Sequence, residues 1–167
     1  MDVTNLPPTK KGRNYEIRGI ALRDFAGLKR DEDRLNPFEL ARYANLLVAT
    51  YEQIEPFLTE ETKLHLIGDG KDSWSGGACS QALPDGRKLI VLNPTHGKNR
   101  QNATLMEEIS HVFLGHKPSK LAITTYNKEG KPIAREYQAD VEEEAYSVGA
   151  SALVPFSALR RMINQGK

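Results

Sequence analysis

Residues 104–116 have the sequence TLMEEISHVFLGH. On a helical wheel, at about 100° per residue, their apolar side chains cover most of the circumference, which is typical of a buried helix. The remaining sector is polar, and its side chains are Thr104, Glu107, Glu108 and His111. Two carboxylates and an imidazole on one stripe of a buried helix need partners, because an unpaired buried charge is costly.

The spacing of these side chains indicates a metal site. Glu107 and His111 stand one helical turn apart, at positions i and i+4, so both can hold one cation. Glu108 points about 100° away from Glu107, where its carboxylate can act as a catalytic base toward a water molecule. In the related helical pattern H-E-x-x-H two histidines bind Zn²⁺, and here Glu107 replaces the first of them. The alternative interpretation is an exposed acidic helix face with His111 at its edge.

A third ligand is expected on a helix over residues 141–152. Glu143 points away from the apolar face of this helix and should be solvated, whereas Glu142 and Glu144 flank that face and either can turn inward. The apolar face consists of Val141, Ala145, Val148 and Ala152. The alternative is a solvated acidic first turn that stabilises the helix through its dipole.

Three further side chains are considered as ligands. His116 lies about 140° from His111 on the wheel and reaches the site only if Gly115 ends the helix and turns the chain, so it is an alternative ligand or a cap. Glu144 is the other alternative ligand. Cys79 is a candidate inhibitory ligand whose thiolate would occupy the open position on the metal, the other interpretation being a small core residue.

Local patterns predict an α+β protein with several helices around a small, mostly antiparallel sheet. Residues 1–14 are expected to form an extended arm and residues 15–167 a single domain. The expected helices span residues 15–28, 36–45, 59–67, 99–115 and 141–152, with a short helix after Pro155. The expected strands span residues 46–50, 78–83, 88–92, 121–126 and 132–137, the last four as two hairpins.

Composition narrows the classes of function. The net charge of +1 gives no overall attraction to nucleic acid or membrane. A single cysteine, no signal-peptide pattern and no long apolar run favour a cytoplasmic protein without a membrane span. Basic residues cluster at 10–13 and 98–100, where they are solvated helix ends or a site for single-stranded DNA.

Two segments together resemble the ImmA/IrrE family of small metallopeptidases. Family members show T-L-x-H-E-x-x-H-x-x-L-G-H, which residues 104–116 match except at Glu107. They then show E-x-E-A-x-x-x-x-A-x-L-L-x-P, to which residues 142–155, EEEAYSVGASALVP, are similar. The resemblance covers about residues 15–160 and implies a zincin-like fold.

This resemblance implies a zinc-dependent endopeptidase that cleaves a helix-turn-helix transcriptional repressor in a stress, DNA-damage or anti-phage response. Single-stranded DNA is a further expected partner, as activator. By position, His111 resembles the second ligand, Glu108 the general base and Glu142 the third ligand. His96 and Tyr146 are candidates for the oxyanion donor.

Glu107 is the departure from the family pattern. A carboxylate oxygen binds Zn²⁺ at about 2.0–2.2 Å, so a site of Glu107, His111 and Glu142 is chemically sound. Its additional negative charge shifts the preference toward harder cations such as Mn²⁺. The alternative is loss of metal and activity, which leaves a catalytically inactive relative that binds a repressor or DNA.

Overall fold

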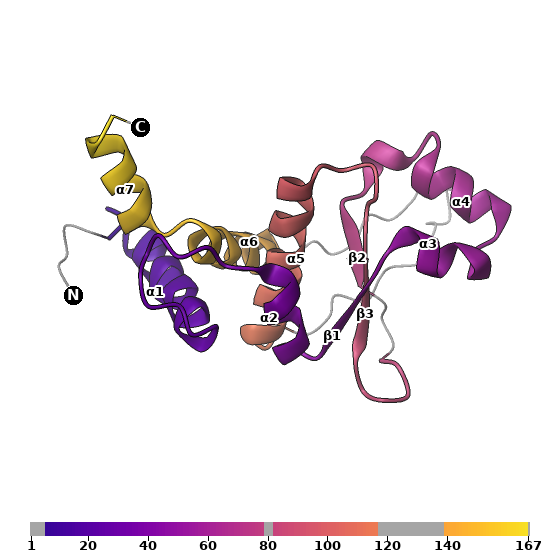
Figure 1. Cartoon of the computed structure of the whole chain (residues 1–167), viewed down its shortest axis with the longest axis horizontal. Coiled ribbons are helices and arrows are strands. Elements are labelled where there is room, and N and C mark those ends of the chain that lie inside the picture. The colour runs from indigo at the N-terminus through magenta and orange to yellow at the C-terminus, as the bar shows by residue number, and fades with distance from the viewer. Residues whose placement is uncertain (1–5, 79–81, 117–138, 167) are drawn as a thin grey trace, which may run out of the picture.

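The computed structural model describes residues 6–78, 82–116 and 139–166. Its helices are α1 (Lys10–Phe25), α2 (Pro37–Tyr43), α3 (Tyr51–Ile54), α4 (Glu60–Ile67), α5 (Lys98–Phe113), α6 (Ala139–Leu153) and α7 (Phe156–Asn164). Its strands are β1 (Leu46–Ala49), β2 (Gly76–Ala78) and β3 (Lys88–Leu92) (Figure 1). Short 3₁₀ turns span Glu55–Phe57 and Lys71–Ser73. The predicted α+β class, with helices around a small sheet, is confirmed.

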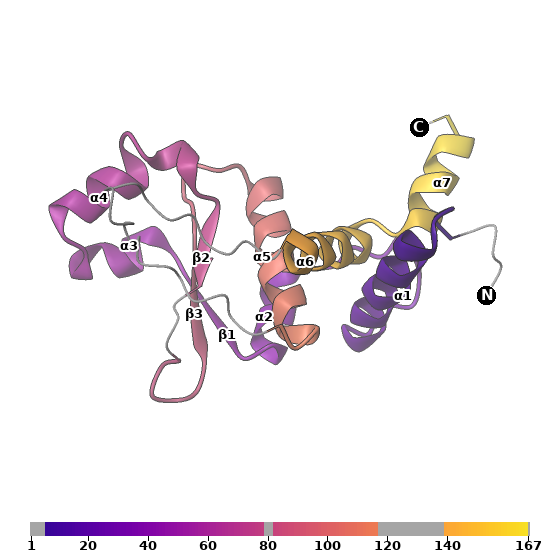
Figure 2. The same ribbon diagram turned by 180° about the vertical axis from the view of Figure 1, so that it is seen from behind.

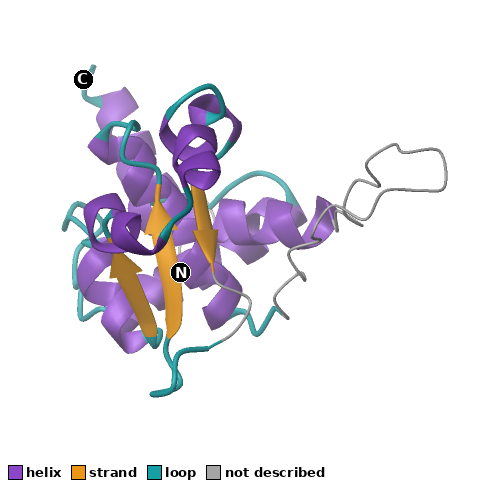
Figure 3. Ribbon diagram, turned by 90° about the vertical axis from the view of Figure 1, so that its right-hand side faces the viewer, coloured by secondary structure: helices purple, strands orange, loops and turns teal. Residues whose placement is uncertain are grey.

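Among the described residues, the sheet has three strands in the order β1-β3-β2 (Figure 3). β2 runs antiparallel to β3, with Gly77 opposite Val91. β1 runs parallel to β3, with Leu47 opposite Leu89. The sheet is therefore mixed, where the sequence predicted mostly antiparallel pairing. The reason is the long connection from β1 to β3 through α3, α4 and β2, which allows β3 to enter the sheet in the direction of β1.

The helices form layers on the sheet. α2 and α5 contact the sheet from one side, and α3 and α4 lie on the other side (Figure 1). α6 packs between α5 and α1, as views from the front and the back both show (Figure 2). The core lies between these helices and the strands β1 and β3, and its buried side chains include Leu22, Leu40, Leu46, Ile90, Leu92, Leu105, Met106, Ile109, Val148 and Ala152.

The first helix begins earlier than expected. α1 starts at Lys10, so residues 10–14, predicted to belong to an extended arm, are helical and that boundary is wrong. Thr9 is the N-cap, and its side-chain oxygen accepts a hydrogen bond from the Gly12 backbone N–H at 3.0 Å. This cap marks the start of the helix, which the pattern of basic residues in this segment did not predict. The predicted N-cap at Asn36 is confirmed, with Asn36 accepting from the Phe38 N–H.

The first hairpin forms with a shifted first strand. β2 covers Gly76–Ala78, ahead of the expected residues 78–83, and the predicted turn at residues 84–86 is present, with the Gly86 N–H bonded to the Leu83 carbonyl. The second expected hairpin, over residues 121–137, lies outside the described residues. Cys79, the candidate inhibitory ligand, lies outside them too. No described helix is long and apolar enough to cross a membrane.

Buried polar contacts join α1 to the end of α6 and the start of α7. Arg23, 4 % exposed as a residue, donates through its guanidinium to the carbonyls of Ala152 and Asp33 at 2.8 and 2.6 Å. Glu16, 2 % exposed, accepts a hydrogen bond at 2.7 Å from the Phe156 N–H, at the first residue of α7. Glu16 thereby caps a helix distant in sequence, because the preceding Pro155 gives α7 no side-chain cap.

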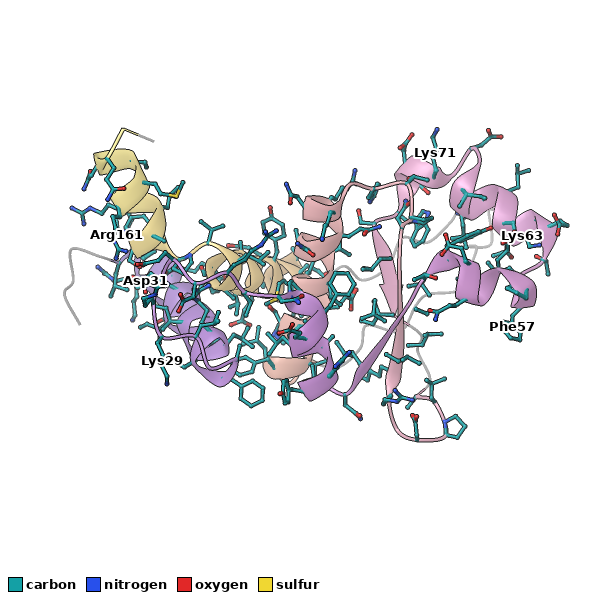
Figure 4. The ribbon with its side chains drawn as sticks, in the orientation of Figure 1. Lys29, Asp31, Phe57, Lys63, Lys71 and Arg161 are labelled. Carbon is teal, nitrogen blue, oxygen red and sulfur yellow. The ribbon has the colours of Figure 1, made fainter. Side chains whose placement is uncertain are left out.

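The surface adds a further link to α7. Arg161 lies beside Asp31 (Figure 4), with its guanidinium 3.6 Å from the Asp31 carboxylate and 2.6 Å from that of Glu32. The side chains in both contacts are about half exposed, so their contribution to stability is small. The buried contacts of Arg23 and Glu16 therefore hold this end of the molecule together.

Candidate metal centre

The polar stripe predicted on α5 remains partly accessible in the folded protein. Leu105, Met106 and Ile109 are buried in the core, as the helical wheel predicted, whereas Val112 and Phe113 near the end of α5 are 37 % and 44 % exposed. Glu107 and Glu108 are half-buried on the polar side of the helix. An amphipathic helix that packs its apolar side on the sheet leaves this stripe for the neighbouring helix, and that neighbour is α6.

Glu142 of α6 completes a group of three donors. The ligand atoms of Glu107, His111 and Glu142 all lie within 4.8 Å of one another. Within this group, His111 Nε2 lies 3.5 Å from a Glu142 carboxylate oxygen. Two helices separated by a long stretch of sequence thus bring together the three residues expected to be metal ligands. Two carboxylates and one imidazole in this arrangement can hold a divalent cation.

The charge balance of this group favours a cation. Burial raises the pKa of Glu107, because the charged carboxylate loses hydration, and the nearby Glu142 carboxylate raises it further. A divalent cation between the two carboxylates would remove this repulsion. The residues present therefore fit a metal ion by their donor chemistry and by their mutual electrostatics.

Glu108 follows Glu107 on the same helix and is half-buried. On the helix it stands about 100° round from Glu107, and its role as a base stays a prediction. Of the two candidates for an oxyanion donor, Tyr146 is 61 % exposed on α6. His96 has both ring nitrogens buried and without a hydrogen bond within the described residues. Neither side chain belongs to the group of three donors.

His116 folds back against His111. The Leu114-Gly115-His116 end of α5 forms a Schellman cap, in which the His116 N–H bonds to the His111 carbonyl at 2.9 Å and the Gly115 N–H to that of Val112 at 3.1 Å. Gly115 has φ +69°, a conformation that glycine adopts readily. The two imidazoles then meet with 3.0 Å between their Nδ1 atoms.

The two alternative ligands, His116 and Glu144, contact each other. His116 Nε2 lies 3.1 Å from a carboxylate oxygen of Glu144, whose other oxygen pairs with Arg18 of α1. Burial lowers the pKa of His116, and the neighbouring His111 lowers it further. Neither His116 nor Glu144 belongs to the group of three donors. Glu143 points outward, as predicted, and pairs with Lys11 at 2.7 Å.

Two residues that support the site were not expected from the sequence. Arg18 carries no local signal, because its contact with Glu144 depends on how α1 packs on α6. Asn93 is fully buried, and its amide nitrogen donates to the carbonyls of Lys71 and Trp74 at 2.6 and 2.8 Å. The Asn93 carbonyl accepts from the Gln101 side chain near the start of α5. The Asn-Pro pair directly after a strand was the only local signal for this junction.

Comparison with known proteins agrees with the chemistry of this site. The sequence model of one family, the IrrE N-terminal-like domain of peptidases, matches residues 59–167 and so includes both helices that carry the donors. No curated protein and no solved structure matches the chain. The family match spans well over half of the sequence. The chain therefore belongs to the family of IrrE N-terminal-like peptidase domains.

Proposed function

We propose that this protein is a metal-dependent endopeptidase whose ion is held by Glu107, His111 and Glu142. The observation that carries the proposal is the convergence of these three donors, within 4.8 Å, from two separate helices. Family membership supports the peptidase class. Zn²⁺ is the proposed ion, and the two carboxylates extend the range to Mn²⁺, since oxygen donors suit harder cations.

The chemistry can be divided between the ion and the chain. When bound, the ion supplies a Lewis acid that polarises the scissile carbonyl and makes a water molecule more acidic. Glu108 accepts a proton from that water molecule as the water oxygen bonds to the carbonyl carbon. Glu108 then returns the proton to the amine nitrogen as the carbon–nitrogen bond breaks. One carboxylate thus acts first as base and then as acid, and no proton is gained or lost overall.

The sheet offers a way to hold an extended substrate. β2 is an edge strand among the described strands, and it contacts α5. Its residue Gly76 lies so close to Thr104 that a Cβ atom there would come within 2.6 Å of the threonine methyl group. Backbone groups on a free strand edge bind extended peptides by adding a strand. A peptide paired with β2 would therefore run beside the helix that carries the donors.

The proposed substrate is a helix-turn-helix repressor, cleaved in a stress, DNA-damage or anti-phage response. This step rests on the resemblance of residues 104–116 and 142–155 to the repressor-cleaving family. A transcriptional repressor as substrate implies a cytoplasmic location for the protein. Single-stranded DNA remains a proposed activator. The two basic clusters lie on α1 and α5, on opposite sides of α6, so they do not form one continuous helix face.

The test compares the wild-type protein with Glu108→Gln. Both proteins should bind one equivalent of Zn²⁺ or Mn²⁺, measured by elemental analysis after dialysis. Only the wild type should cleave a library of peptides that includes helix-turn-helix segments, with new termini identified by mass spectrometry. Glu108→Gln should lower the cleavage rate about 10²–10⁴-fold, the usual loss for a general base.

Two outcomes would contradict the proposal. A wild-type protein that binds no divalent cation would favour the catalytically inactive relative, and binding of a repressor without cleavage would then be measured instead. Cleavage that persists in Glu108→Gln would remove Glu108 from the mechanism. Glu143→Gln is the matched control, because it changes an exposed glutamate on α6 outside the donor group and should leave both metal content and cleavage unchanged.

A further inference from the structure

The two nitrogens of the His111 ring have different neighbours. Nε2 lies on the side of Glu142, at 3.5 Å from its carboxylate, whereas Nδ1 lies 3.0 Å from Nδ1 of His116. A histidine binds a metal through one bare nitrogen, and the group bonded to the other nitrogen decides which one is bare. His116 is therefore in the position that controls the metal-binding form of His111.

The positions of the hydrogen atoms between the two rings can be deduced by starting from Glu144, on the far side of His116. The Arg18 guanidinium pairs with Glu144, and a carboxylate in an ion pair only accepts hydrogen bonds. His116 Nε2, 3.1 Å from Glu144, must then carry the proton and donate it. In a neutral His116 ring the remaining Nδ1 is an acceptor.

The same logic determines the form of His111. If His116 Nδ1 accepts, the hydrogen bond between the two rings requires the proton on His111 Nδ1. His111 Nε2 is then left with its lone pair directed toward the side of Glu142. The opposite assignment would put a proton on His111 Nε2 and block its use as a ligand.

We propose that Arg18, Glu144 and His116 form a chain of positioning residues that selects the tautomer and the orientation of His111 for metal binding. His116 is in this view not a ligand. The inference rests on the proposed metal centre, and it assigns to the L-G-H end of the motif helix a role of its own. The Schellman cap at Gly115 turns the chain so that the His116 ring reaches His111.

Burial supports a fixed arrangement. The His116 side chain is 11 % exposed and that of Glu144 is 27 % exposed, so water competes weakly for these hydrogen bonds. The rings also contact each other edge to face, with 5.1 Å between their centroids. A partly buried hydrogen-bonded network of this kind holds its members more firmly than exposed ion pairs do.

The protein contains a matched control for this chain. Lys11 and Glu143 form a second ion pair between α1 and α6, at 2.7 Å, with both side chains about half exposed. Glu143 precedes Glu144 directly, but its carboxylate pairs with Lys11 in the exposed part of this contact, whereas Glu144 meets His116. Loss of Glu143 therefore removes an ion pair between the same two helices and leaves the histidine chain in place.

The experiment measures Zn²⁺ affinity by competition with a chromophoric chelator. Glu144→Ala and His116→Phe should each weaken Zn²⁺ binding, by about 10–100-fold, the usual effect of losing a partner of a ligating histidine. Glu143→Ala should bind Zn²⁺ as the wild type does. His116→Asn should recover part of the affinity, because its side-chain oxygen can accept from His111 Nδ1. Thermal unfolding of each metal-free variant shows that it is folded.

A second measurement needs no variant. In metal-free wild-type protein with ¹⁵N-labelled histidine, the ring nitrogen shifts should show His111 protonated at Nδ1 and His116 at Nε2. A proton on His111 Nε2, or Glu144→Ala binding Zn²⁺ as tightly as Glu143→Ala, would overturn the inference while leaving the proposed function intact. A wild-type protein that binds no Zn²⁺ or Mn²⁺ would end both.

Discussion

Gly149 of α6 lies against the backbone of Met106 in α5, and this contact limits the separation of the two helices that carry the three candidate metal donors. A Cβ atom at position 149 would lie 3.1 Å from the Met106 carbonyl oxygen and 3.2 Å from the Ser110 hydroxyl. Glu142 stands about two helical turns before Gly149, on the same face of α6. The absence of a side chain at Gly149 therefore allows Glu142 to approach His111.

The variant Gly149→Ala tests this contact. The added methyl meets backbone atoms of a buried helix, and overpacking costs about 1–3 kcal/mol. Alanine gains about 1 kcal/mol over glycine inside a helix, which offsets part of that cost. We expect the free energy of unfolding to fall by about 1 kcal/mol and Zn²⁺ affinity to fall with it. Denaturant unfolding and a Zn²⁺ titration measure the two effects, and a more stable variant with unchanged affinity would contradict the prediction.

Glu107→His restores the pattern H-E-x-x-H and should change the choice of metal. Replacing one of two carboxylates by an imidazole lowers the negative charge of the donor group and favours Zn²⁺ over Mn²⁺. We expect the ratio of Zn²⁺ to Mn²⁺ affinity to rise about ten-fold. Parallel titrations with the two metals measure this ratio. Glu107→Ala serves as the comparison, since it should weaken the binding of both metals, and a ratio that falls in Glu107→His would refute the assignment of Glu107 as a ligand.

Glu16 should make stability depend on pH. Burial raises the pKa of Glu16 above its ordinary value of 4.5, and this effect exceeds the opposing effect of hydrogen bonds from the Phe156 N–H and Ser151. The folded protein thus holds the proton more tightly than the unfolded chain. The contribution is complete below about pH 4.5 and is lost as the pH rises through the folded-state pKa.

The variant Glu16→Gln removes this titration and keeps an oxygen that can accept from Phe156. The stability of the wild type relative to Glu16→Gln should therefore decline as the pH rises from about 4 toward neutrality. The decline should be at most about 1.4 kcal/mol for every ten-fold difference in proton affinity between the folded and unfolded states. Urea midpoints across this range measure the difference. An advantage of the wild type that grows with pH would show that Glu16 is stabilised in its charged form.

Arg23→Met should be among the most damaging single changes. It leaves the carbonyls of Ala152 and Asp33 without their charged donor, and each hydrogen bond to a charged group contributes about 1.5–3 kcal/mol. We expect a loss of about 3 kcal/mol in the free energy of unfolding, measured by chemical denaturation. The exposed Arg30→Met, whose partner is Asp33, is the control and should have a much smaller effect.

The local sequence was sufficient to predict which side chains of α5 share one face at the candidate site. The positions i and i+4 of Glu107 and His111 share a helix face by geometry alone, so their proximity follows once the segment is helical. The wheel also separated the exposed Glu143 from its neighbours correctly. The helical wheel could not decide which of Glu142 and Glu144 is the third candidate ligand, because α6 packs between two helices and both residues face a partner.

Long-range packing accounts for what the sequence did not predict. The sequence makes His116 an alternative ligand, whereas its contact with His111 Nδ1 depends on the cap at Gly115. Its further contact with Glu144 depends on the crossing of α5 and α6. The parallel pairing of β1 with β3 likewise depends on the path of a long connection, which the strand sequences themselves do not encode.

The recognisable part of this protein is shorter than its folding unit. The family match begins at Thr59, yet β1 and the core residues Leu22 and Leu40 all precede it. A chain trimmed to the matched residues would lose the neighbour of β3 on one edge and the helix against which α6 rests. The limits of the family match are therefore a poor guide for designing a truncated protein. A truncation at Thr59 would also remove Arg18 and its ion pair with Glu144 of α6.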